Sequence, residues 1–231
     1  MLYIVSTPIG NLKDISERAL DTLRSVDVII AESPSDSIKL LNAYNISGKK
    51  IIKFNEKNKR QSLESVMTLL KEKNAAYITS AGTPGISDPG QDLVKEARER
   101  GVEVRAIPGP SALISAISVS GIRTKRFTFI SFPPKKSGQL KKLFEEFKSR
   151  GEVLIFFEST HRILKTLEVL TSTFPEVYIC VAKELTKIFE RCFVGKSKDV
   201  FVQIKIDPKS RKGEFVIIVD FAGYKKSLKR V

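Results

Sequence analysis

The chain has 231 residues, 42% of them hydrophobic, and carries 40 Lys and Arg against 26 Asp and Glu, a net charge of +14. This hydrophobic content excludes a mainly disordered protein. The longest apolar runs are strand-sized, far below the roughly 20 residues of a membrane-spanning helix. Because neutralising phosphates releases counterions and drives association, the excess positive charge predicts a polyanionic partner.

The first residues and the cysteines favour a cytoplasmic protein. Met1 to Val5 has no basic segment before it and no small-residue cleavage site after it, so it predicts a first strand and not a signal peptide. Cys180 and Cys192 each lie in a strand-like run, and we expect buried free thiols in a reducing compartment. With one histidine, His161, and no cysteine pair at metal-ligand spacing, the sequence predicts no metal site.

In the first half of the chain, buried strand-like runs alternate with helical patterns. Asp14 is the predicted cap of the first helix, with Glu17 three residues further on. Strands are expected at 2–6, 26–31, 50–54, 76–79 and 102–106, and the later helices at 36–44, 62–73 and 92–98. This alternation predicts a mostly parallel sheet with helices on both faces.

The alternation stops near Gly121, where we place a domain boundary, giving an N-terminal α/β domain at 1–120 and a C-terminal α/β domain at 121–231. The second half has strands expected at 126–132, 152–157 and 177–182, with helices around Leu140 and at 160–173. Its last two expected strands, 189–194 and 215–221, are separated by about twenty residues with a basic turn, which favours some antiparallel pairing.

Two loops rich in small residues, 78–90 and 107–112, each follow a strand and open a helix. In open α/β sheets ligands bind beyond the carboxyl ends of strands, and glycine lets backbone N–H groups approach them closely. An ordinary turn between a strand and a helix is the alternative for either loop alone. Gly10 stands alone where a dinucleotide fingerprint needs three glycines, and no P-loop occurs. A cofactor held by backbone amides and apolar walls is therefore favoured.

Six motifs together resemble the tetrapyrrole methylase superfamily, and within it the enzymes that methylate a cytidine 2′-hydroxyl of small-subunit ribosomal RNA. They are Thr7 to Asn11, Ala81 to Pro84, Pro108 to Ala112, Glu158 to Arg162, Glu184 to Lys187 and Arg211 to Glu214. The resemblance covers the whole chain. It implies two α/β domains with S-adenosylmethionine bound in the cleft between them, a homodimer, and ribosomal RNA or the small ribosomal subunit as partner, with no DNA and no membrane.

The resemblance also implies roles for individual residues. The cofactor is expected at Pro8, Ile9, Gly82, Thr83, Ile86, Ser111 and Ala112, with Leu185 and Phe215. Because a ribose hydroxyl is a weak acid, a base or a nearby cation should assist its deprotonation. The expected catalytic residues are Glu158, Lys183 and Lys187, and the expected substrate contacts are Glu32, His161, Arg162, Arg211 and Lys212. For each, salt bridging or helix capping is the alternative; Glu158 in particular can pair with Arg162.

The sequence departs from the family pattern at two places. Ser33-Pro34-Ser35 stands where Asp-Thr-Arg is usual, and Ser80 stands where an aspartate is usual. Both changes remove charge near the expected cleft. They favour, as a second hypothesis, a non-catalytic RNA-binding or ribosome-binding paralogue. A methylase of a tetrapyrrole-like small molecule is a third hypothesis, for which the broad excess of lysine is unnecessary.

Overall fold

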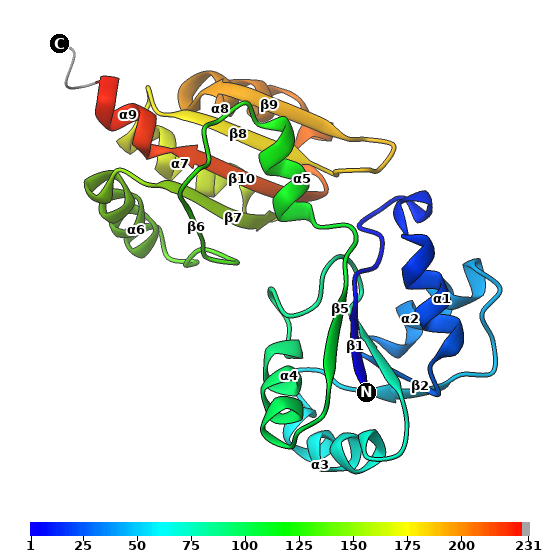
Figure 1. Cartoon of the computed structure of the whole chain (residues 1–231). Helices are drawn as coiled ribbons and strands as arrows, with labels where there is room; N and C mark the ends of the chain where they lie inside the picture. The colour runs from blue at the N-terminus through cyan, green and yellow to red at the C-terminus, as the bar shows by residue number, and fades with distance from the viewer. Residues whose placement is uncertain (228–231) are drawn as a thin grey trace. The chain divides into compact units, whose positions relative to one another are not determined.

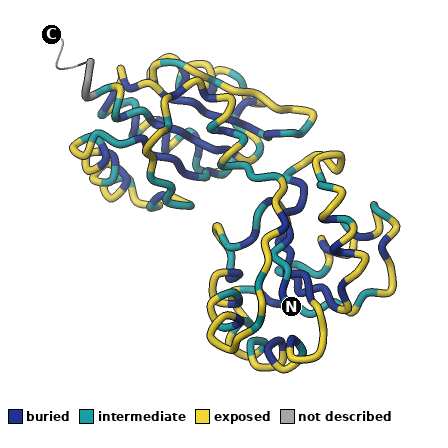
Figure 2. Tube along the Cα trace, viewed as in Figure 1, coloured by how far each residue is buried: buried dark blue, intermediate teal, exposed yellow. Residues whose placement is uncertain are grey.

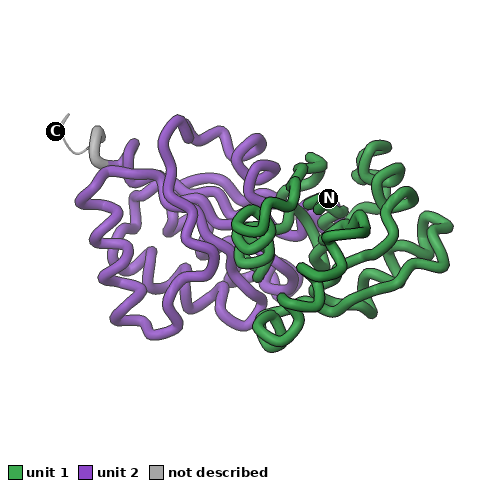
Figure 3. Tube along the Cα trace, turned by 60° about the horizontal axis from the view of Figure 1, so that its bottom comes forward, with its two compact units in different colours: residues 1–111 green, residues 112–231 purple. Residues whose placement is uncertain are grey.

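A computed structural model describes residues 1–227 and divides the chain into two compact units (Figure 3). The first unit covers Met1–Ser111 and the second begins at Ala112. The boundary expected between residues 120 and 121 differs because helix α5 (Ala112–Val119) packs against strand β10 (Glu214–Asp220) of the second unit.

The first unit is built on a parallel five-stranded sheet with the order β3-β2-β4-β1-β5. Figure 1 labels three of these strands, β1, β2 and β5. Its strands are β1 (Leu2–Val5), β2 (Val28–Ala31), β3 (Lys50–Lys53), β4 (Ala75–Ile78) and β5 (Val104–Ile107). Every residue of β2 and β4 is buried, as expected for interior strands of a parallel sheet that is covered on both faces. The predicted parallel sheet is confirmed.

Helices cover both faces of this sheet. Helices α1 (Glu17–Ser25) and α2 (Pro34–Ala43) pack Leu23 and Leu41 on one face, and α3 (Lys59–Leu70) and α4 (Gly90–Glu99) pack Met67 and Leu93 on the other. A short 3₁₀ turn, Leu12–Asp14, precedes α1. The predicted cap was wrong: Ser16, not Asp14, accepts the Ala19 N–H at 3.2 Å, because the 3₁₀ turn delays the start of the helix.

The second unit has a mixed sheet with the order β6-β7-β10-β8-β9. Its other strands are β6 (Phe127–Phe129), β7 (Val153–Ser159), β8 (Tyr178–Lys183) and β9 (Arg191–Lys196). Some antiparallel pairing was predicted for the last two strands and is confirmed, since β10 pairs antiparallel with β7 and β8, and β9 pairs antiparallel with β8. The two strands are not neighbours, because β8 lies between them. Strand β10 thus places Phe215 opposite Glu158 on one side and opposite Lys183 on the other.

One face of this second sheet carries the hydrophobic core. Figure 2 shows buried stretches of the strands in dark blue. Leu140, Leu167 and Ile204 enter this core from helices α6 (Ser137–Arg150), α7 (Ile163–Thr173) and α8 (Ser197–Ile206). A 3₁₀ turn (Pro208–Arg211) and α9 (Phe221–Ser227) complete the described chain. Helix α8 was missed because its apolar residues are mostly β-branched; Val200 and Ile204 face the core, while Val202 and Ile206 are exposed.

Three further expectations concern the surface. Cys180 is buried as predicted, but Cys192 is exposed because β9 is an edge strand. Part of the positive charge from which a polyanionic partner is predicted, Lys225 to Arg230, lies outside the residues whose side chains are described. No helix within residues 1–227 is long and apolar enough to cross a membrane.

Candidate functional site

Three loops of the first unit meet beyond the carboxyl ends of β4, β1 and β5. The strand order makes these three strands neighbours, so the loops that leave them are also neighbours. Thr7 and Gly82 exchange backbone hydrogen bonds of 3.0 Å in both directions, which joins the first loop to the second. Thr83 joins all three loops, because its Oγ1 lies 3.0 Å from Ser6 Oγ and donates at 3.0 Å to the Pro110 carbonyl.

The loops approach so closely that two positions require glycine. Gly82 has φ +79°, and a Cβ there would lie 3.3 Å from Ile9 Cγ2. At Gly109 a Cβ would lie 3.0 Å from Ser6 Cβ. A side chain at either position therefore pushes neighbouring loops apart.

Asp88 shapes the second loop, although no role was predicted for it from the sequence. Its carboxylate accepts the N–H groups of Gly85 at 2.7 Å and of Gly90 at 2.8 Å, and the Tyr77 hydroxyl at 3.1 Å. A weaker bond of 3.3 Å comes from the Ile86 N–H. An aspartate that precedes Pro-Gly is a typical turn-forming signal, and that signal could have identified it.

A second carboxylate, Glu32, lies beyond the carboxyl end of β2. Its partial burial, reinforced by the nearby Asp88 charge, raises the pKa of Glu32, and a hydrogen bond from the Ser80 N–H opposes this shift. The hydroxyl of Ser80 also donates to a carboxylate oxygen of Asp36 on α2, at 3.4 Å. The edge of the sheet therefore carries negative charge beside Ser80, although Ser80 itself has none.

The cofactor residues expected in the first unit fit a molecule with apolar and polar parts. Pro8 and Gly82 are buried, Ile9, Thr83 and Ser111 are half-buried, and the side chain of Ile86 is exposed. Thr7 Oγ1 is buried and has no hydrogen-bond partner among the described residues, so it offers an unused polar group beside these loops. Ala112, the first residue of the second unit, is half-buried.

In the second unit, the carboxylate of Glu158 is buried beneath α7. One of its oxygens accepts the Ser159 N–H at 2.8 Å, and the other accepts the Thr166 hydroxyl at 2.7 Å and lies 3.5 Å from Arg162. Arg162 also donates to the carbonyls of Pro133 and Pro134, both at 2.9 Å. These contacts support the pairing alternative for Glu158 and Arg162.

The lysines near the carboxyl end of β8 differ in environment. Lys187 Nζ lies 2.9 Å from Glu184 and 2.8 Å from Glu214. Burial alone would lower the pKa of Lys187, but its hydrogen bonds to the two carboxylates outweigh burial and raise it. Lys187 is therefore held as a cation and is unsuited to act as a base. Lys183 is buried beside Phe215 and donates at 3.3 Å to the Phe189 carbonyl.

The remaining predicted residues of the second unit are spread between its core and its surface. Leu185 and Phe215 are buried, whereas His161 and Lys212 are exposed. Arg211 donates to the Lys205 carbonyl, and its Nε is buried with no hydrogen-bond partner among the described residues. Of these, the structure brings Phe215 between Glu158 and Lys183 in one cross-strand row.

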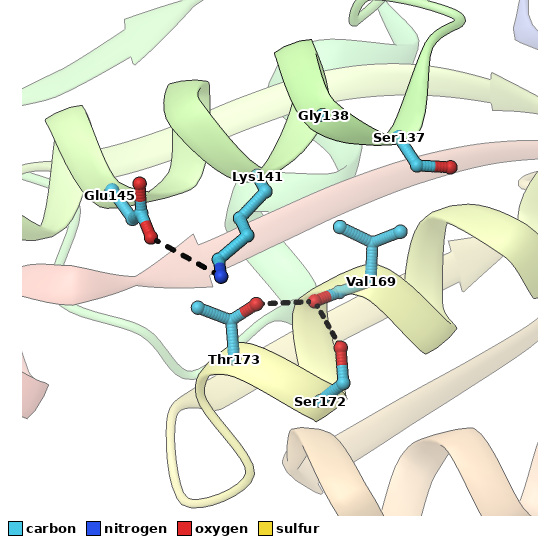
Figure 4. Close-up of a pocket in the computed structure, with 7 residues that line it drawn as sticks. All are labelled: Ser137, Gly138, Lys141, Glu145, Val169, Ser172 and Thr173. Carbon is cyan, nitrogen blue, oxygen red and sulfur yellow. Dashed lines mark hydrogen bonds and ion pairs between the residues drawn. The ribbon is translucent and has the colours of Figure 1, made fainter.

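A groove of about 640 Å³ between α6 and α7 contains none of the predicted site residues (Figure 4). The hydroxyls of Ser172 and Thr173 both donate to the Val169 carbonyl, and Lys141 lies 3.9 Å from Glu145. These polar side chains already have partners, so the groove is a weaker candidate site. Within the described residues, no group of three or more His, Cys, Asp or Glu is gathered so as to hold a metal.

Two α/β units, with close-packed loops beyond the carboxyl ends of the first sheet, define the class of protein. Residues 1–200 match the family model of the tetrapyrrole (corrin/porphyrin) methylases. The chain belongs to this family, and it is an S-adenosylmethionine-dependent methyltransferase, which confirms the predicted fold class and cofactor.

Particular relatives agree with this assignment. The chain is 40% identical to the ribosomal RNA small subunit methyltransferase I of Thermotoga maritima, over 94% of this chain and 97% of that one. It is 43% identical to the protein of the same name from Haemophilus influenzae, over 95% of this chain and 78% of that one. A crystal structure of diphthine synthase has the same fold, with a TM-score of 0.73 at 15% identity, covering 94% of this chain and 89% of that one.

Proposed function

We propose that this protein transfers the methyl group of S-adenosylmethionine to the 2′-hydroxyl of a cytidine in small-subunit ribosomal RNA. The observation that carries the proposal is the 40% identity, over nearly the full length of both chains, to a relative named for methylation of small-subunit ribosomal RNA. The net charge of +14 supports a polyanionic substrate, because RNA binding gains free energy from counterion release.

In this proposal the loops of the first unit hold the cofactor. Ile9 and Ile86 supply apolar surface, and backbone groups around Gly82 approach the ligand closely. When bound, S-adenosylmethionine supplies an electrophilic methyl group on a sulfonium. The chain has to orient the ribose hydroxyl in line with that methyl group, and such positioning accounts for much of the rate.

Charged residues of both units are proposed to act on the substrate. Lys187, kept protonated by Glu184 and Glu214, has a third N–H donor, with which it is proposed to orient the ribose hydroxyl. Lys183 is the second proposed catalytic group. His161, Arg211 and Lys212 are proposed to contact the RNA, and Glu32 to contact the nucleoside. Glu158 is proposed to hold Arg162 in place.

The second hypothesis, a non-catalytic RNA-binding or ribosome-binding paralogue, is less well supported than the methyltransferase. It rests on the missing charges at Ser33 to Ser35 and at Ser80, but Asp36 lies 3.4 Å from the Ser80 hydroxyl. A carboxylate is therefore present close to the position where the family pattern has one.

The proposal is tested by mass mapping of ribosomal RNA nucleosides from cells with and without this protein. We expect one 2′-O-methylcytidine of the small subunit to be missing when the protein is absent. The wild-type protein should restore it in vitro with S-adenosylmethionine and either the RNA or the assembled subunit. An unchanged nucleoside map in the deleted cells would contradict the proposal.

A further inference from the structure

The loop between β8 and β9, residues 184–190, has a defined conformation. Glu184 and Thr186 have positive φ values of 49° and 67°, which non-glycine residues adopt only when their surroundings hold them. Backbone bonds of 3.0 Å run from the Lys187 N–H to the Glu184 carbonyl and from the Glu190 N–H to the Lys187 carbonyl. The Lys187 ion pairs and the Lys183 bond to the Phe189 carbonyl fasten the loop further. Its tip is therefore held in place.

This loop displays two large apolar side chains to solvent. Ile188 is 95% exposed and Phe189 is 71% exposed, whereas Leu185 in the same loop is buried and anchors it. Apolar side chains on a flexible loop can fold back onto the protein surface, but this loop holds them outward. Such a display fits a surface that contacts a partner.

A basic segment lies beside the loop. Arg191, directly after it, pairs with Asp207 at 3.1 Å and reaches Ser210 Oγ at 3.5 Å, which ties the base of the loop to residues 205–212. That segment carries four cations, Lys205, Lys209, Arg211 and Lys212, against the single acid Asp207. Within the described residues no ion pair is found for Lys209 or Lys212, so their charges remain available to a phosphate backbone.

We propose that loop 184–190 is a platform on which an unpaired base of the RNA substrate stacks, with Phe189 as the stacking ring and residues 209–212 contacting the adjacent phosphates. An exposed aromatic ring beside cations is the arrangement by which proteins hold single-stranded nucleic acid. The inference rests on the proposed function and adds the residues that recognise an unpaired nucleotide. A second copy of this chain is the alternative occupant; beside a segment with four cations and one acid, charge complementarity favours the phosphates of RNA.

The absence of tryptophan from the chain makes a direct test simple. Phe189→Trp places a single indole at the tip of the loop, and stacking of a base on it should quench its fluorescence when a cytidine-rich single-stranded RNA is added. Tyr178→Trp is the matched control, because Tyr178 is 45% exposed at the opposite end of β8. Quenching confined to Phe189→Trp supports the proposal; equal quenching in both variants, or in neither, overturns it.

Affinity measurements give a second test. Phe189→Ala and Phe189→Leu should each raise the Kd for this RNA about tenfold, and Phe189→Tyr should leave it within about twofold. Because the side chain is exposed, none of the three should lower the melting temperature appreciably. Unchanged affinity in Phe189→Ala overturns the proposal. So does a loss of self-association in Phe189→Ala that Phe189→Leu preserves, measured by sedimentation, because apolar packing between two copies would then be the role of the loop.

The two hypotheses fail in distinguishable ways. If the wild-type protein methylates ribosomal RNA while Phe189→Ala binds and methylates it equally well, the platform is wrong and the proposed function stands. If the wild-type protein neither binds nor methylates RNA, both are wrong.

Discussion

Gly82 is the residue on which the contact between the first two loops depends. Its φ of +79° is unfavourable for any other residue, and the position faces Ile9 on the neighbouring loop. The effect of the positive φ can be separated from the effect of the close contact by comparison with Gly48. Gly48 has nearly the same φ, +73°, but an added Cβ there would have no atom within 4 Å.

We expect Gly82→Val to abolish S-adenosylmethionine binding, measured by calorimetry, because the valine side chain forces Ile9 away from the loop. Gly48→Val carries a similar backbone cost of about 1–2 kcal/mol and should bind the cofactor normally. Equal affinity in both variants would show that the loops do not form the cofactor site.

For Glu158, the buried contacts revise what a substitution should do. Glu158→Gln removes the charge of a carboxylate that contacts the Ser159 N–H, the Thr166 hydroxyl and Arg162, so we expect a loss of about 2 kcal/mol of stability. Single-turnover methyl transfer should fall by less than about tenfold, because the carboxylate is directed to α7. A fall of about a hundredfold with unchanged melting temperature would instead support direct catalysis by Glu158.

The sequence revealed where Glu158 lies along the chain but not which way its side chain points. Side chains of a strand alternate between faces, and Leu154, Phe156 and Glu158 share the face that α7 covers. The alternate set, Ile155 and Phe157, is equally apolar. Composition therefore gives no means of deciding which face the helices cover.

At the scale of elements, local patterns predicted most strands and helices, and the loops that follow parallel strands. They failed where pairing is long-range: nothing in Glu214 to Asp220 indicates that this last strand inserts between β7 and β8. The insertion brings Phe215 between Glu158 and Lys183, so part of the candidate site depends on contacts that no local signal encodes. The hydrogen bonds that Asp88 accepts from Gly85, Gly90 and Tyr77 likewise exist only once the loop is folded.

We predict that the connection between β4 and α4 depends on Asp88. Asp88→Ala leaves the N–H groups of Gly85 and Gly90 and the buried Tyr77 hydroxyl without their acceptor, which should cost about 3 kcal/mol of stability. The cofactor Kd should rise about tenfold, because the loop is no longer preorganised. Asp92→Ala, which removes an exposed ion pair with Lys59, should change stability by less than about 0.5 kcal/mol and serves as the control. Denaturant unfolding and calorimetry measure both quantities, and a stable Asp88→Ala protein with normal affinity would contradict the prediction.

At the scale of the whole molecule, the lysines that contribute to the charge of +14 differ in whether an ion pair already neutralises them. Lys59 is paired with Glu56 at 2.7 Å and with Asp92 at 2.6 Å, so it has little charge left to offer. Lys135 and Lys136, by contrast, form no ion pair with any described residue. We therefore expect RNA binding to depend mainly on the lysines without ion pairs, and less on the net charge of the chain.

We predict that affinity for a small-subunit RNA fragment falls steeply with salt, by about a thousandfold between 50 and 200 mM if about six phosphates are contacted. Replacing both Lys135 and Lys136 with Gln should weaken binding to all RNA sequences alike and should reduce the slope of log Kd against log salt by about two, one for each lost phosphate contact. Lys59→Gln should leave that slope unchanged, because Glu56 and Asp92 already neutralise Lys59.

Binding curves across a salt series measure the slopes. A flat salt response of the wild-type protein would contradict a phosphate-driven interaction, and an equal reduction in Lys59→Gln would show that ion pairing within the protein does not determine which lysines meet the RNA.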